Sequence, residues 1–583
     1  MEVTMLMVIT IFTINVYLQR PILDSFLFSL ALAVGLTPQL LPAIISVNLS
    51  HGAREMAQKK VIVKRLASIE NLGSMNLLCS DKTGTLTEGE LELQSFQDLK
   101  GEQNEKVLLY SSLNAYYQKG FENPIDRAIL AQNKFDLGEY EKLDEIPYDF
   151  VRKRLSILVS KNGTNLMITK GALPNILEIC SQAEAEPGKT VEISEFKERI
   201  EQRFEEFSGK GFRTLGVAYR EMGQQKTIGK EQEKGMSFLG FLFFFDPPKP
   251  DIIKTIESME QLGISLKIIT GDNRFVAASI SREVGLKNSR VLTGSELDKM
   301  SSEALMKQVN DNDVFAEVEP SQKEHIILAL KKSGNVVGYM GDGINDASAL
   351  HAADVGISVD SAADVAKEAA DFVLMEKSLN ALVEGVKEGR KTFANTLKYV
   401  FMATSANFGN MFSMAGASLF LPFLPLLPTQ ILLINLLTDF PEMTIATDAV
   451  DREMVEKPRR WDIGFIRKFM VVFGITSSVF DYLTFGALLL LLPGITEEFR
   501  TGWFMESVIS ASLIVLVIRS RRPFFRSRPG KYLLIATIFI VVLTLCFPLT
   551  PFAAPFGFKP LTIQIILVLG AIIGLYIFAA ETI

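Results

Sequence analysis

The alternation of apolar and polar stretches constrains this chain more than any other feature of its sequence. Two apolar stretches, residues 3–17 and 26–47, precede one long polar region, residues 50–391. Six further apolar stretches follow, at residues 393–421, 428–447, 469–492, 503–518, 532–549 and 561–580. Each of the first two stretches can cross roughly 30 Å of hydrocarbon as a helix, the first one only marginally. So many stretches disfavour the core helices of a soluble protein, and we expect two membrane spans, a large water-soluble insert and six more spans.

The charges of the loops orient these spans. The loops at residues 451–468 and 519–531 are rich in Lys and Arg, whereas three alternate loops carry a single cation each, Arg20, Arg500 and Lys559. Basic loops stay on the cytoplasmic side, and the insert lies on the same side by parity. We therefore expect the insert in the cytoplasm.

The composition fits a chain divided between membrane and water, since 48% of its residues are hydrophobic and 22% are charged. The formal net charge is −7, which gives no basic face for a polyanion, so we expect no nucleic-acid partner. The three cysteines, Cys79, Cys180 and Cys546, lie far apart and predict neither a disulfide framework nor a zinc site.

The insert has the pattern of an α/β domain that another domain interrupts. Three short apolar runs end in polar turns: residues 75–78 lead to Asp81, residues 265–269 to Thr-Gly-Asp-Asn at 270–273, and residues 335–340 to Gly-Asp-Gly-Ile-Asn-Asp at 341–346. The carboxyl ends of parallel strands meet at one edge of a sheet, where ligands bind. Asp81 and Asp342, remote in sequence, can therefore share one site. Between them, residues 93–240 carry their own strand and helix patterns and predict an inserted domain.

The segment Cys-Ser-Asp-Lys-Thr-Gly-Thr-Leu-Thr at residues 79–87 carries the most informative chemistry of the chain. A carboxylate that attacks phosphorus forms an acyl phosphate, and the attack needs Mg²⁺ and a cation against the crowded negative charge. We therefore expect Asp81 to be the nucleophile, with Lys82 and Thr83 beside it. The alternative is an ordinary acidic turn at the end of a strand.

Two further carboxylates predict a metal site. Asp342 and Asp346 lie four residues apart on a glycine-flexed turn that opens a helix, and with Asp81 they form an oxygen-rich set of the kind that Mg²⁺ prefers. We expect Asp342 to be a direct ligand, Asp346 and Asn345 to hold waters or orient Asp342, and Thr83 to add its backbone carbonyl. The alternative is a capped helix start, since Asn-Asp-Ala-Ser is good N-cap material.

The turn at Thr270, Gly271 and Asp272 offers a hydroxyl group and backbone N–H groups to phosphoryl oxygens, as the N-terminus of a helix does. Lys323, between the second and third predicted strands, is the expected cation for the developing charge. The alternative for a single lysine is a solvated surface residue.

With these motifs the chain resembles the P-type ATPases. Five motifs occur in the order and rough spacing of that family: residues 81–87, Lys-Gly-Ala at 170–172, Asp-Pro-Pro at 246–248, residues 270–273 and residues 341–346. The resemblance implies a multidomain fold: an α-helical transmembrane bundle and an α/β haloacid-dehalogenase-like (Rossmannoid) phosphorylation domain, with an α+β nucleotide-binding domain inserted in the latter. The implied order is two transmembrane helices at 1–48, the phosphorylation domain at 49–92 and 241–390, the nucleotide-binding domain at 93–240, and six transmembrane helices at 391–583.

The resemblance also implies ATP and Mg²⁺ as cofactors. The residues that match the family's ATP contacts are Tyr148, which would stack on adenine, and Lys153, Lys170, Gly171 and Arg213. The match at Lys153 is open by one position, because Arg152 and Arg154 flank it. Without the family, these residues are interpreted as ordinary packing and surface charge.

Polar residues inside the apolar stretches are costly in a membrane and usually functional. Pro38 and Pro42 flank Gln39 in the second stretch, and such a break is tolerated only where it lines a buried or wet cavity; a simple kink is the alternative. The resemblance implies that this segment belongs to the ion site. Other candidate ligands of the transported ion are Asn407, Asn410, Asn435, Asp439 and Glu442. Oxygen ligands suit a hard cation such as Mg²⁺ or Ca²⁺ better than copper or zinc.

Residues 33–38, 61–66 and 439–448 most resemble the magnesium-transporting branch (type III B) of prokaryotes. We therefore expect ATP-driven import of a divalent cation, Mg²⁺, through an aspartyl phosphate, in a multi-pass protein of the plasma (cell inner) membrane. The family commonly has a glutamate where this chain has Gln39, which predicts a weaker divalent site or altered proton coupling.

A second departure concerns the actuator domain, whose Thr-Gly-Glu loop hydrolyses the aspartyl phosphate in the family. No Thr-Gly-Glu occurs in this sequence. We expect a fragment without the actuator and the first two spans, or a separate actuator-containing segment as a partner. Alone, such a chain is expected to accept phosphate on Asp81 but to turn over slowly. Two other interpretations stay open: a membrane-anchored haloacid-dehalogenase-type phosphatase or phosphotransferase without transport, and a transport-incompetent fragment.

Overall fold

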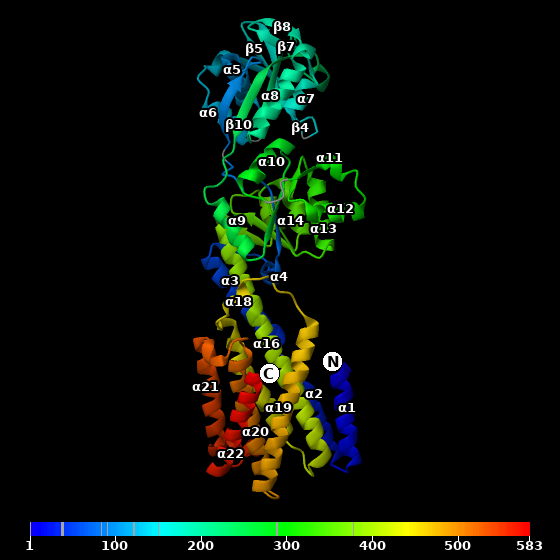
Figure 1. Cartoon of the computed structure of the whole chain (residues 1–583), viewed down its shortest axis with the longest axis vertical. Coiled ribbons are helices and arrows are strands. Elements are labelled where there is room, and N and C mark those ends of the chain that lie inside the picture. The colour runs from blue at the N-terminus through cyan, green and yellow to red at the C-terminus, as the bar shows by residue number, and fades with distance from the viewer. Residues whose placement is uncertain are drawn as a thin grey trace. The chain divides into compact units, whose positions relative to one another are not determined.

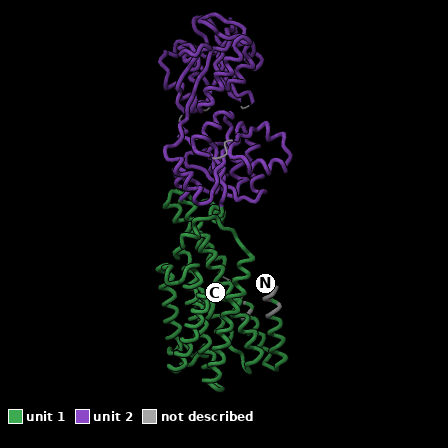
Figure 2. The backbone as a smooth tube through the Cα atoms, in the orientation of Figure 1, with its two compact units in different colours: residues 1–74, 384–583 green, residues 75–383 purple. Residues whose placement is uncertain are grey.

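The structure of the chain is a computed structural model (Figure 1). It describes residues 2–35, 40–82, 84–89, 91–119, 123–149, 151–286, 290–376 and 378–583. The chain divides into two compact units, one of residues 1–74 and 384–583 and one of residues 75–383 (Figure 2). Of the predicted site residues, Gln39 and Thr83 lie outside the described residues.

The first unit is a bundle of helices with one short strand. Its elements are α1 (Glu2–Tyr17), α2 (Ile22–Gly35), α3 (Leu41–Gln58), β1 (Val61–Val63), α4 (Ser68–Ser74), most of α16 (Leu379–Phe420), α17 (Pro428–Met443), α18 (Arg452–Val455), α19 (Ile463–Leu491), α20 (Thr496–Ile518), α21 (Lys531–Cys546) and α22 (Ile563–Thr582). The predicted second apolar stretch is two helices here, because α2 ends at Gly35 and α3 begins at Leu41.

Within the described residues, four helices are long and apolar enough to cross a membrane: Ile463–Leu491, Thr496–Ile518, Lys531–Leu549 and Ile563–Thr582. Shorter apolar helices cover Val8–Tyr17 and Ile22–Ala31. Helix α20 lies inside the bundle, in contact with α17, α19, α21 and α22. Its Trp503 packs edge-on against Phe485 of α19, with ring centroids 4.6 Å apart, and both side chains are buried.

The second unit contains two sheets, the first of them parallel. Its strands in this unit are β2 (Leu77–Ser80), β11 (Ser265–Ile269), β12 (Val291–Thr293), β13 (Val314–Ala316), β14 (Val337–Met340), β15 (Val355–Val359) and β16 (Phe372–Leu374). They lie in the order β16-β15-β14-β2-β11-β13-β12. The helices beside this sheet are α9 (Ile252–Gln261), α10 (Arg274–Glu283), α11 (Gly294–Leu297), α12 (Ser302–Asp311), α13 (Pro320–Lys332), α14 (Ala347–Ala352) and α15 (Asp364–Ala369) (Figure 1).

Strands β2, β14 and β15 of this sheet are buried along their whole length, as expected of a parallel sheet covered on both faces. This explains why they are continuous apolar runs in the sequence. The predicted strand at 265–269 is confirmed as β11, whereas β2 and β14 begin two residues later than the predicted runs at 75–78 and 335–340.

The second sheet is mostly antiparallel. Its strands are β3 (Glu92–Gln97), β4 (Glu141–Asp149), β5 (Arg154–Lys161), β6 (Thr164–Ala172), β7 (Cys180–Glu186), β8 (Lys189–Glu192), β9 (Arg213–Glu221) and β10 (Met236–Phe245). The order is β4-β5-β6-β9-β10-β7-β8, and β3 pairs antiparallel with β10. The accompanying helices are α5 (Glu105–Tyr117), α6 (Pro124–Ala131), α7 (Leu173–Leu177) and α8 (Lys197–Gly209).

Alternate residues of these strands feed two different cores. Ile157 and Val159 of β5 join the cluster that includes residues of α5 and α6, whereas Leu158 between them joins the cluster that includes residues of α7 and α8. Side chains of a strand alternate between its two faces, so this sheet is covered on both sides.

Candidate functional site

Strand β2 carries Asp81 to an edge of the parallel sheet where three predicted motifs meet. Ser80 pairs with Ile268 of β11 on one side and with Met340 of β14 on the other. The Asp81 N–H donates to the carbonyl of Met340 at 3.1 Å. The turns that begin at Thr270 and Gly341 therefore lie on either side of Asp81. The convergence of the three strand ends is confirmed.

Lys323 lies in the first turn of α13, which a capping box of Glu319 and Gln322 begins. Its Nζ donates to Oδ2 of Asp81 at 2.7 Å and to Oδ1 of Asp346 at 2.7 Å. Lys323 is only 4% exposed, so the alternative of a solvated surface lysine is excluded. Burial alone would lower the pKa of Lys323, but the two carboxylates outweigh burial and raise it above its ordinary value. The ammonium group therefore stays charged beside Asp81.

The carboxyl group of Asp81 is affected both by burial and by nearby charged groups. Burial raises the pKa of Asp81, and Asp346 and Asp272 add to the rise, while Lys323 opposes it. The backbone N–H of Lys82 donates to Oδ1 of Asp81 at 2.6 Å. Lys323 and this N–H thus stabilise the ionised carboxylate that a nucleophile needs.

Asp346 is held by three donors. The hydroxyl group of Tyr339 donates to its Oδ1 at 2.6 Å, in addition to Lys323, and the N–H of Gly343 donates to its Oδ2 at 3.0 Å. The side chain lies across Gly341, where an added Cβ would come within 2.6 Å of the Cβ and Cγ atoms of Asp346. A glycine is therefore required at position 341 to let this carboxylate reach Lys323.

The ammonium group of Lys82 lies near two further carboxylates, those of Asp272 and Asp246. Its Nζ lies 2.6 Å from Oδ2 of Asp272 and 3.9 Å from Oδ2 of Asp246. Asp246 also accepts hydrogen bonds from the Thr87 hydroxyl group at 2.7 Å and the Gly89 N–H at 2.9 Å. The Asp-Pro-Pro motif thus fixes the loop that follows Asp81. Burial alone would raise the pKa of Asp272, but the nearby cations, chiefly Lys82, outweigh burial and lower it.

The oxygen donors at this edge fit Mg²⁺ in one specific way. Among the residues that the structure describes, no three or more His, Cys, Asp or Glu side chains are grouped so as to hold a metal. Mg²⁺ usually takes one or two carboxylates together with waters and phosphate oxygens, and this needs no such group. Asp81 and Asp342 at neighbouring strand ends provide those carboxylates, whereas the oxygens of Asp346 are engaged by its three donors.

The other predicted residues of this edge are placed as follows. Thr270 is buried, and its hydroxyl group accepts a hydrogen bond from the Asp272 N–H at 3.1 Å. Gly271 is exposed, and Asn345 is exposed in a short 3₁₀ turn, Ile344–Asp346. All three lie in turns that directly follow β11 or β14.

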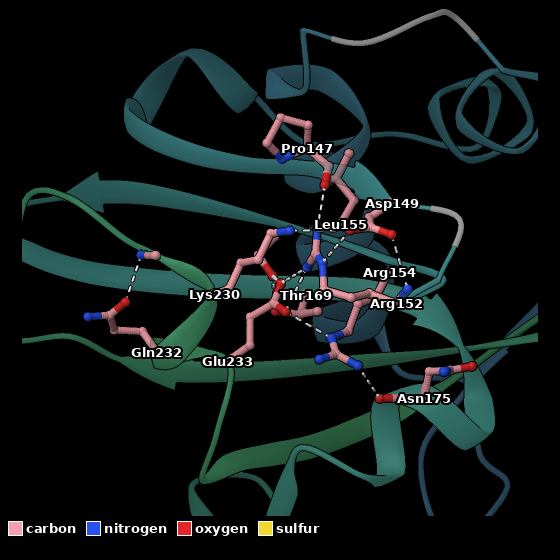
Figure 3. A network of polar contacts seen from close by, with 12 residues as sticks. Pro147, Asp149, Arg152, Arg154, Leu155, Thr169, Asn175, Lys230, Gln232 and Glu233 are labelled. Atoms are coloured by element: carbon pink, nitrogen blue, oxygen red, sulfur yellow. Dashed lines mark hydrogen bonds and ion pairs between the residues drawn. The ribbon is translucent and has the colours of Figure 1, made fainter.

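The second sheet carries the predicted nucleotide contacts. Figure 3 shows Arg152 and Arg154 converging on Glu233. Arg152 Nη1 lies 2.7 Å and Arg154 Nε 2.9 Å from Oε2 of this carboxylate, whose side chain is completely buried. No ion pair with another described residue is found for Lys153, which has a left-handed backbone conformation with φ of 50°. Arg152 and Arg154 therefore serve to hold Glu233 in the fold. This favours Lys153 as the cation of the three that is available to a ligand.

The close approach of strands β5 and β6 explains the glycine of the Lys-Gly-Ala motif. A Cβ atom at Gly171 would lie 2.5 Å from the carbonyl oxygen of Lys153. The neighbouring Lys170 is buried and forms an ion pair with Asp126; burial lowers the pKa of Lys170 and Asp126 opposes that effect. Tyr148 is 52% exposed, as a stacking aromatic must be.

The predicted ion ligands are only partly brought together. Asn410 of α16 and Glu442 of α17 line one cavity of the helical unit, and Glu442 is buried. Asn407, Asn435 and Asp439 do not line this cavity and are half-buried.

The family model described as P-type ATPase, cytoplasmic domain N, matches residues 68–251, and Cation transporting ATPase, C-terminus, matches residues 423–583. The chain is 41% identical to Magnesium-transporting ATPase, P-type 1 of Escherichia coli K12, over 93% of this chain and 62% of that protein. It is 30% identical to Calcium-transporting ATPase of Bacillus subtilis 168, over 93% of this chain and 67% of that protein. The chain belongs to the P-type ATPases.

Membership of the P-type ATPases agrees with the two kinds of unit, an α/β unit that is cytoplasmic and a bundle with several membrane-crossing helices. A second magnesium-transporting relative, from Salmonella typhimurium LT2, is 40% identical over 96% of this chain and 63% of its own length. The chain thus spans about three fifths of the magnesium-transporting relatives that it matches. A phosphatase without transport is not favoured, since the C-terminal model is that of cation-transporting ATPases.

Sequence reasoning missed three residues of this P-type ATPase that the geometry makes prominent. Tyr339 holds Asp346, Glu233 holds two arginines, and Asp481 lies buried among the membrane helices. Only Asp481 had a local signal, as a single carboxylate inside an apolar stretch. Tyr339 lies in a buried strand and Glu233 in a charged loop, and nothing in the sequence around either residue predicts a special role for it.

Proposed function

We propose that this chain is the catalytic and transport part of an ATP-driven cation pump that forms an aspartyl phosphate on Asp81. The observation that carries the proposal is the position of Asp81 at the end of β2, between two strand ends, with Lys323 Nζ 2.7 Å from its Oδ2. A haloacid-dehalogenase-like phosphorylation domain, residues 49–92 and 241–390, with the nucleotide-binding domain at 93–240, is the architecture that we assign to this chemistry.

The reaction that these residues support is a phosphoryl transfer. The Asp81 carboxylate attacks the γ-phosphorus of ATP, a bond forms between its oxygen and phosphorus, and the bond to the β-phosphate oxygen breaks, with ADP leaving with the electron pair. Lys323 neutralises the charge that gathers on the equatorial oxygens, as an electrostatic donor does. Lys82, Thr83, Thr270, Gly271, Asp272 and Asn345 are the residues that we assign to holding the phosphoryl group.

Mg²⁺ would be held by Asp81, Asp342 and the backbone carbonyl of Thr83, with Asp346 behind them, and when bound it supplies charge neutralisation to the transferring phosphoryl group. For ATP, we assign Tyr148 to stacking on adenine and Lys153, Lys170, Gly171 and Arg213 to the nucleotide's polar groups.

The transported ion is a divalent cation, and we propose Mg²⁺ import across the plasma membrane. Two relatives that are 40–41% identical support this choice, since both are named magnesium-transporting ATPases. Asn410 and Glu442, which line one cavity, are the described residues that we assign first to the ion, with Gln39, Asn407, Asn435 and Asp439 as further ligands.

The test is transfer of ³²P from [γ-³²P]ATP to the purified full chain, across a panel of cations, with and without a supplied actuator-containing segment. We expect an acid-stable, hydroxylamine-sensitive label that Asp81→Asn abolishes and that the actuator segment turns over. Label of equal amount on the Asp81→Asn variant would refute the proposal. Magnesium-dependent uptake into sealed vesicles tests the ion separately.

A further inference from the structure

A small polar cavity lies among five helices of the membrane unit. Its volume is about 30 Å³, and residues of α16, α17, α19, α20 and α22 line it. The polar lining residues that matter here are Asn410, Glu442, Ser477, Asp481, Ser510 and Tyr576. No Lys, Arg or His is among the described residues of the lining. A cavity of this size holds one or two water-sized groups, so a fully hydrated divalent cation does not fit.

Glu442 is a buried carboxylate at this cavity that no described residue hydrogen-bonds. Its side chain is 6% exposed, and no hydrogen bond or ion pair joins it to a described residue. Another carboxylate, Asp439 on the same helix, acts on it electrostatically. A buried ionised carboxylate without a positive or hydrogen-bonding partner is strongly unfavourable, so either a proton or a bound cation must neutralise it.

Asp481 brings a second carboxylate to the same cavity from α19. It is 4% exposed, and two donors fix its orientation: Ser413 Oγ donates to Oδ2 at 2.6 Å and Trp503 Nε1 donates to Oδ1 at 2.8 Å. Neither donor is charged, and the buried Glu506 of α20 also shares a hydrogen bond with Asp481. Each carboxylate oxygen has two lone pairs, so these three partners leave an acceptor site open. Asp481 is therefore pre-oriented and keeps acceptor capacity for a cation.

Small residues bring α19 close to α16 at this depth. A Cβ atom at Gly409 would lie 3.1 Å from the Cβ of Ser477, and one at Gly474 would lie 2.5 Å from the Phe408 ring. The Ser478 hydroxyl group also donates to the carbonyl of Gly409 at 3.0 Å. This close packing fixes the distance between Asp481 and the residues of α16 that line the cavity, as rigid support of a binding site requires.

We propose that Asp481 is a cation ligand, and that it forms with Glu442 and the Asn410 amide a site for a divalent cation stripped of most of its water. The donors are all oxygen atoms, which suits Mg²⁺ better than a soft metal. This inference rests on the proposed function, because Asn410 and Glu442 are already assigned to ion transport there. It adds a helix, α19, that none of the predicted ligands comes from.

Trp503 provides a reporter inside the site. The chain has two tryptophans, and Trp461→Phe leaves Trp503, whose indole N–H contacts Asp481, as the only one. The full chain is made with Trp461→Phe and Asp81→Asn, so that phosphorylation is excluded, and titrated with MgCl₂ while Trp503 emission is followed. Bound Mn²⁺ is counted in parallel by electron paramagnetic resonance, since this count does not depend on the tryptophan.

We expect a saturable change of Trp503 emission and one Mn²⁺ that requires Asp481. Asp481→Asn should raise the half-saturating Mg²⁺ concentration at least tenfold and remove that Mn²⁺, whereas the control Glu497→Gln, at an exposed glutamate of α20, should change neither. Equal affinity and Mn²⁺ count in Asp481→Asn would overturn the inference. A Trp503 signal that follows pH but not Mg²⁺ would also overturn it and identify a proton as the occupant. Failure of the proposed function shows separately, as absence of ³²P label on Asp81.

Discussion

The ammonium nitrogen of Lys323 lies 2.7 Å from a carboxylate oxygen of Asp81, although 242 residues separate them in the chain. The same nitrogen lies 2.7 Å from Asp346. One buried cation thus balances two carboxylates at the edge of the parallel sheet. This arrangement makes Lys323 the residue on which the charge balance at Asp81 depends.

Lys323→Met removes this cation at nearly constant size. We expect phosphorylation of Asp81 by ATP to slow by about 10²–10³-fold, as on losing an electrostatic donor to a transition state. The rate is measured in single-turnover rapid-quench experiments with [γ-³²P]ATP. The control is Lys332→Met, an exposed lysine near the end of the same helix, which should keep the parent rate. An unchanged rate in Lys323→Met would contradict the assignment.

Tyr339→Phe deletes one of the three donors to Asp346. Because Lys323 and the Gly343 N–H remain, we expect a loss of about 1 kcal/mol, or roughly fivefold in the same phosphorylation rate. Tyr116→Phe, at a 57% exposed tyrosine, is the matched control. A loss as large as that of Lys323→Met would mean that Tyr339 has a direct role and does not only position Asp346.

Gly171→Ala places a methyl group 2.5 Å from the Lys153 carbonyl oxygen and should force β5 and β6 apart beside the proposed nucleotide contacts. Overpacking of this kind costs about 1–3 kcal/mol, so we expect a fluorescent ATP analogue to bind about tenfold more weakly. Gly209→Ala, where an added Cβ meets nothing within 4 Å, should bind normally. Phosphorylation of Asp81 by acetyl phosphate needs no adenine site and should be unchanged in both variants.

Glu233 gives a prediction of pH dependence. Burial alone would raise its pKa, but hydrogen bonds from Arg152, Ser156 and Arg154 outweigh burial and lower it below the ordinary value of 4.5. A carboxylate with a lowered folded-state pKa stabilises the fold above its unfolded pKa, and this contribution is lost as the pH falls through the folded value. Glu233→Gln should therefore destabilise β5 by about 3 kcal/mol at neutral pH, and the difference should shrink below pH 4.5.

The measurement for Glu233 is hydrogen–deuterium exchange of β5 peptides in the full chain, corrected for the intrinsic exchange rate at each pH. Glu231→Gln, two residues away and exposed, serves as the control and should show no difference at any pH. A destabilisation by Glu233→Gln that grows toward acid pH would show that the sign is wrong.

The sequence predicts well that three motifs meet at Asp81, because the relevant information is local. Each buried strand ends in a polar turn, and parallel pairing alone brings Asp81, Thr270 and Asp342 to one edge. The contacts that stabilise this edge are not local. Tyr339 reaches Asp346, and Asp246 reaches Thr87, through side-chain geometry that no periodicity encodes.

In the membrane part, too, the positions of the helices are encoded locally, whereas the contacts between them are not. Apolar stretches predict where helices lie: α17 begins at the first residue of the predicted stretch 428–447, and α21 begins one residue before the predicted stretch 532–549. Which polar residues share a cavity depends on helix rotation and packing. Asp481 therefore meets Glu442 at a cavity only once Gly409 and Gly474 have set the spacing of α16 and α19.

The antiparallel pairing of β3 with β10 has a practical consequence for this protein. Phe245 faces Glu92 on the last rung of that ladder, so the polypeptide enters and leaves the second sheet at adjacent points. Residues 92–245 can therefore be excised and expressed as a separate protein whose two termini lie close together. The two chain ends that this excision leaves in the rest of the protein can be joined by a short linker. The excised piece contains none of the apolar helices that the described residues form, so its recognition of nucleotide could be studied in plain buffer without detergent.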